Sequence, residues 1–118
     1  MAHFAEINEN NVVLRILVIS NDQENRGQEF LSEDLGLGGR WVQTSYNSNI
    51  RKMYAMIGGI YNEQLDIFLP PKPFPSWRLN ETLGEWESPI PRPDIPNKVL
   101  RWNEENQEWD ITDPIILL

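Results

Sequence analysis

The chain has 118 residues, no cysteine, a single histidine and a formal net charge of −8 at pH 7. Without cysteine, disulfide scaffolds, cysteine-based zinc sites and thiol catalysis are excluded. The acidic balance repels a phosphate backbone, and no apolar run approaches the ~20 residues of a membrane-spanning helix, so neither nucleic acid nor membrane is an expected partner. The length predicts a single domain over 1–118, with one half at 1–58 and another at 59–118.

The first half predicts a small β-sheet with one short helix. Residues 4–7 and 12–19 are expected to pair as a hairpin around the polar stretch 8–11. The second arm is nearly all apolar, which is typical of a strand covered on both faces, so we expect it at the centre of the sheet. Residues 28–35 carry one apolar stripe and predict a short helix that ends at the following glycines. Residues 41–45 predict a further strand.

Arg51 and Lys52 form an adjacent basic pair in the loop that follows this strand. With Tyr46 and Tyr54 nearby, the pair could clamp an anionic ligand or stack against it. The alternative is that both charges offset acidic groups of the protein itself. We keep Arg51 and Lys52 as candidate partner-binding residues.

An Asn-Glu pattern recurs along the chain. In each copy an apolar residue directly precedes the Asn, and four residues separate the Glu from a large apolar residue. The copies span 7–14, 61–68, 79–86 and 102–109. We interpret each copy as a β-hairpin with the apolar pair on its two arms, because Asn tolerates the left-handed region and hydrogen-bonds its own backbone. Glu and Gln would also suit a helix, but the flanking apolar residues alternate with period two. Alternatively, Asn-Glu before a turn is simply common in acidic β proteins.

Most of the nine prolines lie in the stretches 70–77 and 89–96. Proline lacks a backbone N–H, so these stretches predict semi-rigid straps that join successive hairpins and lay Phe74 and Trp77 onto the core. They could instead be ligands for aromatic-lined grooves. The predicted fold is therefore mainly β, or α+β at most: an N-terminal sheet with one short helix, followed by proline-linked hairpins in an elongated C-terminal half.

The sequence ends in four aliphatic residues, Ile115, Ile116, Leu117 and Leu118. Burying each of them contributes roughly 1.5–3 kcal/mol, so they should dock on this chain or on a neighbour. We favour the neighbour, because a last strand beyond Pro114 has no obvious partner arm.

Three stretches carry a resemblance to a known group: Trp-Val-Gln-Thr-Ser-Tyr-Asn at 41–47, Arg-Lys-Met-Tyr-Ala-Met-Ile-Gly at 51–58, and Pro-Pro-Lys-Pro-Phe-Pro-Ser-Trp at 70–77. The chain resembles a family of small proteins encoded by tailed phages of marine cyanobacteria and other marine bacteria. It departs from the group's pattern at Met56, where glycine is usual, and in its aliphatic end. The group has no agreed activity, so the resemblance implies a phage setting without a mechanism.

From these observations we expect a non-enzymatic virion protein, such as a capsid decoration protein or a neck, tail or fibre accessory. It would be made in the host cytoplasm and would contact other virion proteins or copies of itself. The alternatives are an intracellular protein that binds a basic host target and a carbohydrate-binding module whose tryptophans stack on sugar rings. Candidate contact residues, besides the basic pair and the aliphatic end, are Trp86, Trp102 and Trp109.

No catalytic, cofactor or metal site is expected. Carboxylates such as Asp66, Glu81, Glu104 and Glu105 cluster at the predicted hairpin tips. A turn in solvent neither raises the proton affinity of a carboxylate nor excludes water from it. We therefore expect these groups to be solvated rather than to act as an acid–base pair.

Overall fold

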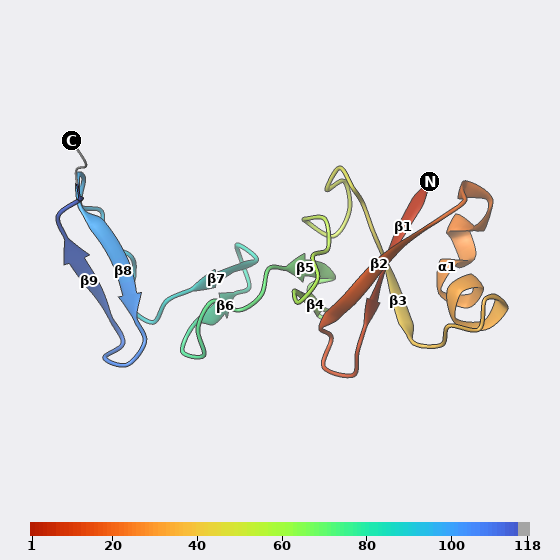
Figure 1. Cartoon of the computed structure of the whole chain (residues 1–118), viewed down its shortest axis with the longest axis horizontal. Coiled ribbons are helices and arrows are strands. Elements are labelled where there is room, and N and C mark those ends of the chain that lie inside the picture. Colours follow the sequence, from red (N-terminus) through yellow and green to blue (C-terminus); the bar gives the residue numbers. More distant parts are fainter. Residues whose placement is uncertain (116–118) are drawn as a thin grey trace. The chain divides into compact units, whose positions relative to one another are not determined.

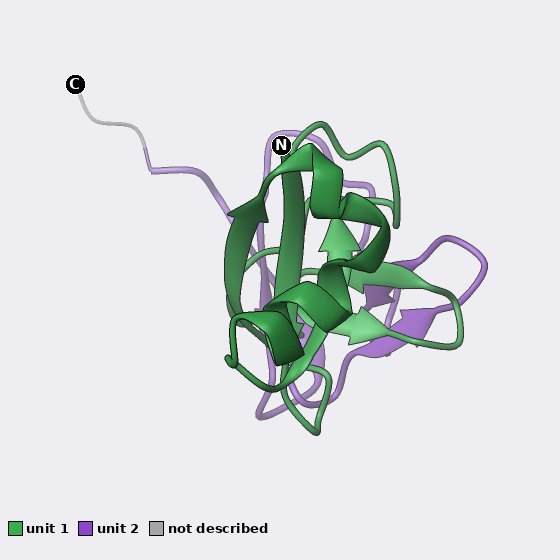
Figure 2. Cartoon of the chain, turned by 90° about the vertical axis from the view of Figure 1, so that its right-hand side faces the viewer, with its two compact units in different colours: residues 1–72 green, residues 73–118 purple. Residues whose placement is uncertain are grey.

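The computed structural model describes residues 1–115 of the chain and divides it into two compact units, 1–72 (unit 1) and 73–118 (unit 2) (Figure 2). The chain is mainly β, as predicted, with antiparallel strands and one short helical segment. The strands of unit 1 are β1 (Ala2–Ile7), β2 (Val13–Ile19), β3 (Arg40–Thr44), β4 (Ile60–Asn62) and β5 (Ile67–Leu69). Those of unit 2 are β6 (Arg78–Asn80), β7 (Glu85–Glu87), β8 (Val99–Asn103) and β9 (Glu108–Thr112).

Unit 1 is built on a three-stranded antiparallel sheet in the order β2-β1-β3 (Figure 1). The prediction that β2 occupies the centre is wrong, because β1 does. Leu14 and Val18 on β2 are each 47% exposed. Arg15, in the same strand, donates a hydrogen bond to Glu6 at 2.7 Å and lies 5.3 Å over the ring of Trp41. A strand that carries an arginine and two half-exposed apolar residues suits the edge of a sheet.

Both faces of β1 are covered, which explains its central place. Alternate side chains of a strand point to opposite faces. On one face the helical segment contributes Leu31 to a cluster with Ala2, Phe4, Ile19 and Trp41. On the other face the hairpin β4–β5 contributes to a cluster of Ala5, Ile7, Val13, Ala55, Tyr61 and Phe68. Unit 1 therefore consists of a sheet with a helical layer on one side and a hairpin on the other (Figure 1).

The helical segment begins earlier than predicted. It comprises a 3₁₀ turn η1 (Asn21–Arg26), one α-turn α1 (Gly27–Glu29) and a π-helical turn η2 (Phe30–Asp34). Gly27 is required here by space, since a Cβ at this position would lie 2.0 Å from the ring of Phe4. The segment ends at Gly36, whose φ of +70° continues no helix, as the glycine pattern predicted.

The three later copies of the Asn-Glu pattern form one and the same hairpin. Each pairs the predicted apolar residues across its two strands: Tyr61 with Phe68, Leu79 with Trp86, and Trp102 with Trp109. The Asn side chain holds each turn, because its Oδ1 accepts backbone N–H groups two or three residues ahead, as when Asn80 accepts from Thr82 at 3.0 Å and Leu83 at 2.9 Å. The hairpin prediction is confirmed for these three copies.

The same turn position is left-handed in each of these hairpins. Asp66, Gly84 and Gln107 have φ values of +54°, +67° and +51°. This position suits glycine, which has no Cβ to clash with the carbonyl oxygen, and costs other residues roughly 1–2 kcal/mol. Only the hairpin β6–β7 has a glycine there.

The weaker first copy differs by one residue. Its hairpin β1–β2 pairs Ile7 with Val13 instead of the predicted Leu14, and the register shifts between Glu6 and Ile7. The loop is shorter, because the Asn8 N–H donates to Val12 O at 3.0 Å. A shorter loop moves the apolar pair by one position and turns Leu14 outward.

The proline stretches form no strands, as predicted. The boundary between the two units lies in the first stretch, after Lys72, rather than after residue 58. It lies there because the hairpin β4–β5 belongs to unit 1, where Tyr61 and Phe68 join the core cluster. Unit 2 therefore contains two of the three repeated hairpins together with the strap 89–96.

Candidate functional site

Unit 2 is centred on a cluster of aromatic rings. Trp77, which lies just before β6, is 6.1 Å from Trp102 and 6.1 Å from Trp109, while Trp102 and Trp109 are 5.4 Å apart. All three contacts are edge-to-face, the arrangement favoured by the ring quadrupole. Phe74 adds a fourth ring at 5.8 Å from Trp77. The first strap therefore lays Phe74 and Trp77 onto the core of unit 2, as the sequence predicted.

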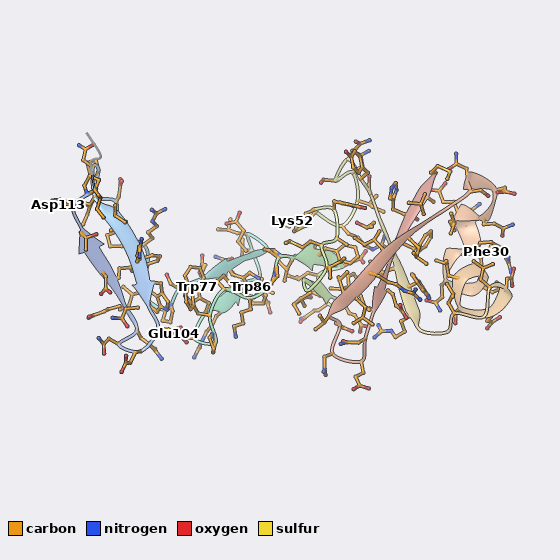
Figure 3. All side chains as sticks on the ribbon, viewed as in Figure 1. Phe30, Lys52, Trp77, Trp86, Glu104 and Asp113 are labelled. Atoms are coloured by element: carbon orange, nitrogen blue, oxygen red, sulfur yellow. The ribbon has the colours of Figure 1, made fainter. Side chains whose placement is uncertain are left out.

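Glu104, at the tip of the hairpin β8–β9, connects this cluster to the first strap. Its carboxylate accepts the Ser76 N–H at 3.0 Å and the Ser76 Oγ–H at 2.5 Å. It also accepts the indole N–H of Trp102 at 2.8 Å. The expectation that the carboxylates at the tips are merely solvated is wrong for Glu104. Its charge is used to hold two segments of unit 2 together (Figure 3).

The second strap is fastened to Trp109. The Trp109 indole N–H donates to the backbone oxygen of Ile90 at 2.8 Å, and the Ser88 hydroxyl donates to the same oxygen at 2.6 Å. Pro89 and Pro91 on either side of Ile90 have no N–H to form a ladder. The carbonyl of Ile90 is therefore held by side chains instead of by a strand.

A pocket of about 340 Å³ opens between the second strap, 89–96, and the rings of unit 2. Its apolar walls are Trp77, Trp86, Trp109 and Pro91, and its polar lining is supplied by Glu87, Ser88 and Arg92. Trp86 comes from β7 and Trp77 from the chain just before β6 (Figure 3), and Pro91 and Arg92 of the second strap add to the lining. Concave, mostly aromatic surfaces with a few polar groups are typical of binding sites.

The polar groups of this pocket differ in how they are engaged. Glu87 accepts a hydrogen bond from the side-chain amide of Asn80 at 2.6 Å. Arg92 makes no hydrogen bond or ion pair within residues 1–115. The indole N–H of Trp77 is buried and has no partner among the same residues. The pocket thus offers three indole rings and one uncommitted guanidinium to a ligand.

Arg51 has a structural role in unit 1. Its Nε donates to Asp66 at 2.8 Å and its Nη1 donates to the backbone oxygen of Gln43 at 3.1 Å. The Tyr61 hydroxyl donates to the same carboxylate at 2.5 Å. These hydrogen bonds, from Tyr61 first and then from Arg51, lower the pKa of Asp66. Arg51 therefore offsets an acid of the protein itself, the alternative left open by the sequence.

Two further pKa values reflect this network. Burial raises the pKa of Tyr61, and the hydrogen bond to Asp66 adds to the effect. Burial lowers the pKa of Arg51, but hydrogen bonds with Asp66 and Tyr61 outweigh this effect, so the pKa of Arg51 is raised overall.

Arg51 and Lys52 both adopt left-handed backbone, with φ of +51° and +72°. The Arg51 carbonyl accepts the Phe68 N–H at 3.0 Å, which fixes this corner against β5.

The tyrosines near the basic pair lie with the histidine instead. His3 stacks on Tyr46 with ring centroids 6.1 Å apart and meets Tyr54 edge-on at 5.8 Å. A shallow hollow of about 700 Å³ in unit 1 includes His3 and Tyr46 among its lining residues, together with Thr44 and several amide side chains. Arg51 is turned toward Asp66. Of the two alternatives that the sequence left open for the basic pair, this arrangement favours the offsetting of an acid of the protein over a clamp around an anion.

The candidate contact residues of the sequence fall into three groups. Trp86 and Trp109 line the pocket, whereas Trp102 is 9% exposed and packs against Trp77 and Trp109 in the ring cluster. Ile115 is 89% exposed. Ile116, Leu117 and Leu118 lie outside the described residues, so the docking expected of the aliphatic end remains a prediction. Lys52, labelled in Figure 3, lies in the loop between β3 and β4.

Sequence reasoning missed three members of the site: Trp77, Glu104 and Arg92. The sequence assigned Trp77 only to the core. Its position directly after Pro-Ser, at the end of the first strap, is the signal that could have placed its ring where the strap meets the hairpin β6–β7. Glu104 follows the Asn of its copy in the same way as Glu63 and Glu81 do, so nothing local distinguishes it. Its partner Ser76 lies 28 residues away.

None of the helical turns described for the chain is long and apolar enough to span a membrane. Within residues 1–115, no group of three or more histidine, aspartate or glutamate side chains gathers as metal ligands would. Comparisons of the chain with protein-family models, with curated proteins and with solved structures find no match.

Proposed function

We propose that this chain is a non-enzymatic binding protein of a tailed phage, carried in the virion, which acts through protein–protein contacts made by the tryptophan pocket of unit 2. The observation that carries the proposal is this pocket, where Trp77, Trp86 and Trp109 surround a common opening. Tryptophan and arginine dominate the energetics of protein interfaces, and Arg92 stands beside the three rings without a partner of its own among the described residues.

The phage setting rests on the resemblance of 41–47, 51–58 and 70–77 to phage proteins. Ile115 is exposed and belongs to the aliphatic stretch 115–118, an apolar sequence that suits contact with a neighbour in an assembly. A capsid decoration protein or a neck, tail or fibre accessory would each make use of both features.

The test is mass spectrometry of gradient-purified particles of the phage that encodes the chain, after a high-salt wash. We expect peptides of this chain at a constant ratio to the major capsid protein. Recovery of the chain only in the soluble lysate of infected cells would contradict a virion role and would favour an intracellular role, in which the acidic surface meets a basic host protein.

A second candidate function is carbohydrate binding, and a specific observation favours it. The rings of the pocket stand beside Glu87 and Arg92, charged groups that can hydrogen-bond hydroxyls. Binding of the full chain to an array of host-surface glycans, lost in Trp86→Ala and retained in Ile111→Ala, would support this function. Ile111 is the matched control, because it is an exposed apolar residue of unit 2 that is not among the pocket's lining residues.

A further inference from the structure

We infer that the ligand of the tryptophan pocket is an extended, proline-rich segment of a partner protein that carries an acidic residue. This inference rests on the proposed function and specifies the chemistry of the partner that the pocket would bind.

The first support is a ligand-like contact inside unit 2 itself. The indole N–H of Trp109 donates to the carbonyl of Ile90 at 2.8 Å, and Ile90 stands between Pro89 and Pro91. A proline-rich segment leaves its carbonyls without backbone partners, because proline has no N–H. Aromatic grooves that recognise such segments exploit this preformed extended geometry. The strap and Trp109 already reproduce one such contact within a single chain.

The second support is the space beside that contact. The pocket continues from Trp109 to Trp86 and Trp77, with Pro91 of the strap on its rim. Its volume of about 340 Å³ is at the lower end of the ~300–1,000 Å³ of ligand pockets, which suits a few side chains rather than a large ligand. Flat indole walls pack well against prolyl rings, which present an apolar face and no N–H that needs a partner. A second proline-rich segment can therefore lie against the rings that the strap leaves uncovered.

The third support is charge. Arg92 lines the pocket and makes no hydrogen bond or ion pair within residues 1–115. Glu87, the acidic residue of the lining, is engaged by Asn80 through a hydrogen bond of 2.6 Å. An acidic residue in the ligand would pair with Arg92, whereas a basic residue at that point would meet like charge. The ligand therefore carries Asp or Glu among its prolines.

The test uses the full chain labelled with ¹⁵N, whose five tryptophans give five indole N–H resonances. The probe is the synthetic peptide Ac-Pro-Pro-Pro-Glu-Pro-Pro-Pro-NH₂, and a matched peptide carries Lys in place of Glu. We expect the Trp86 and Trp109 resonances to shift on titration, while Trp41, buried in unit 1, stays in place. No shift at several millimolar peptide would overturn the inference.

Variants sharpen the test. Trp86→Ala should weaken binding of the Glu peptide by at least about 10-fold, as loss of a central interface ring does. Arg92→Gln should weaken it by roughly two- to five-fold, in line with an exposed ion pair, and should abolish the preference over the Lys peptide. Ile111→Ala should bind as the parent does. Equal binding of both peptides by the parent chain would contradict the part assigned to Arg92.

A chito-oligosaccharide is titrated in parallel. If the sugar shifts Trp86 and Trp109 and the peptide does not, the pocket is a glycan site and the inference is wrong. Particle proteomics separates this result from the proposed function. If the chain is found in virions but does not bind the peptide, only the inferred ligand class is wrong. If it binds the peptide but is absent from virions, only the proposed virion role is wrong.

Discussion

The same hairpin is stabilised in two different ways in the two units. In unit 1, Phe68 on the second arm of hairpin β4–β5 is 1% exposed and packs into the core formed with the sheet. In unit 2, Trp86 and Trp109 occupy the equivalent positions of their hairpins and are only partly buried, on the walls of a pocket. A short hairpin is marginal alone and needs a covering layer. Unit 1 supplies that layer as a sheet, and unit 2 supplies it with other tryptophans and a proline strap.

The difference explains where the candidate site lies. A position whose side chain is fully covered by its own unit, such as Phe68, has no surface left for a ligand. In unit 2 the cover is incomplete, so that Trp86 and Trp109 combine a structural contact on one side with an open face on the other. We attribute the candidate site to this shortage of internal cover.

The largest effect is expected from Phe68→Ala. Removing a ring that is 1% exposed leaves a cavity, and such changes cost about 3–5 kcal/mol of the free energy of unfolding. Urea unfolding followed through the indole resonance of Trp41 measures the loss in unit 1. Gln64→Ala at the exposed tip of the same hairpin is the control and should stay within about 0.5 kcal/mol of the parent. Similar losses in both variants would contradict the core role of Phe68.

The next largest effect is expected from Glu104→Ala. It removes the acceptor of the Ser76 N–H, the Ser76 hydroxyl and the Trp102 indole, so unit 2 should lose about 2–3 kcal/mol. Unfolding is followed through the Trp102 and Trp109 indole resonances. Glu105→Ala, an exposed acid at the same tip, should change stability by less than about 0.5 kcal/mol. If the two variants unfold alike, Glu104 is not the connecting residue that we describe.

Two smaller effects on stability, of opposite sign, are expected at the left-handed turn position. Gln107→Gly relieves a φ of +51° and should stabilise unit 2 by about 0.5–1 kcal/mol. Gly84→Ala places a Cβ at a φ of +67° and should destabilise it by about 1 kcal/mol. Thermal unfolding of both variants checks the signs. Shifts of the same sign would contradict the equivalence of the two turns.

The smallest expected effect is the dependence of the stability of unit 1 on pH in the acidic range. The hydrogen bonds from Tyr61 and Arg51 lower the pKa of Asp66 below its value in the unfolded chain. The stabilisation is therefore present above an unfolded value of about 3.9 and is lost as the pH falls through the lower folded value. The effect should be small, because the Asp66 side chain is 58% exposed.

Asp66→Asn provides the measurement of this acid dependence. Urea midpoints of unit 1 are compared at about pH 6 and about pH 3. The parent should lose slightly more stability than Asp66→Asn between the two. An equal or larger loss in the variant would show that Asp66 contributes nothing to the acid response.

The hairpins of this chain could be predicted because their signals are local. An Asn that bonds its own turn, and apolar residues spaced to face each other across two arms, need nothing from distant residues. The place of β2 could not be predicted in this way. Its apolar run matches a buried strand, and only the packing of the helical segment and of hairpin β4–β5 on β1 makes β1 the central strand.

The candidate site was predictable only in part, for the same reason. Trp86 and Trp109 stand out as large rings on hairpin arms, so the sequence identified them. The contacts that shape their surroundings join residues far apart: Ser76 with Glu104 across 28 positions, and Ile90 with Trp109 across 19. No spacing rule connects such pairs, because their approach depends on how the straps fold back.

In unit 2 the Asn-Glu copies are hairpins, and the rings of Trp77, Trp102 and Trp109 meet in one cluster. Nuclear Overhauser contacts of the full chain in solution test it most directly. We expect cross-strand contacts between Leu79 and Trp86 and between Trp102 and Trp109, together with contacts from the Trp77 ring to both Trp102 and Trp109. Contacts between residues three apart through 80–87 and 103–110, without the cross-strand ones, would mean helices and would contradict it.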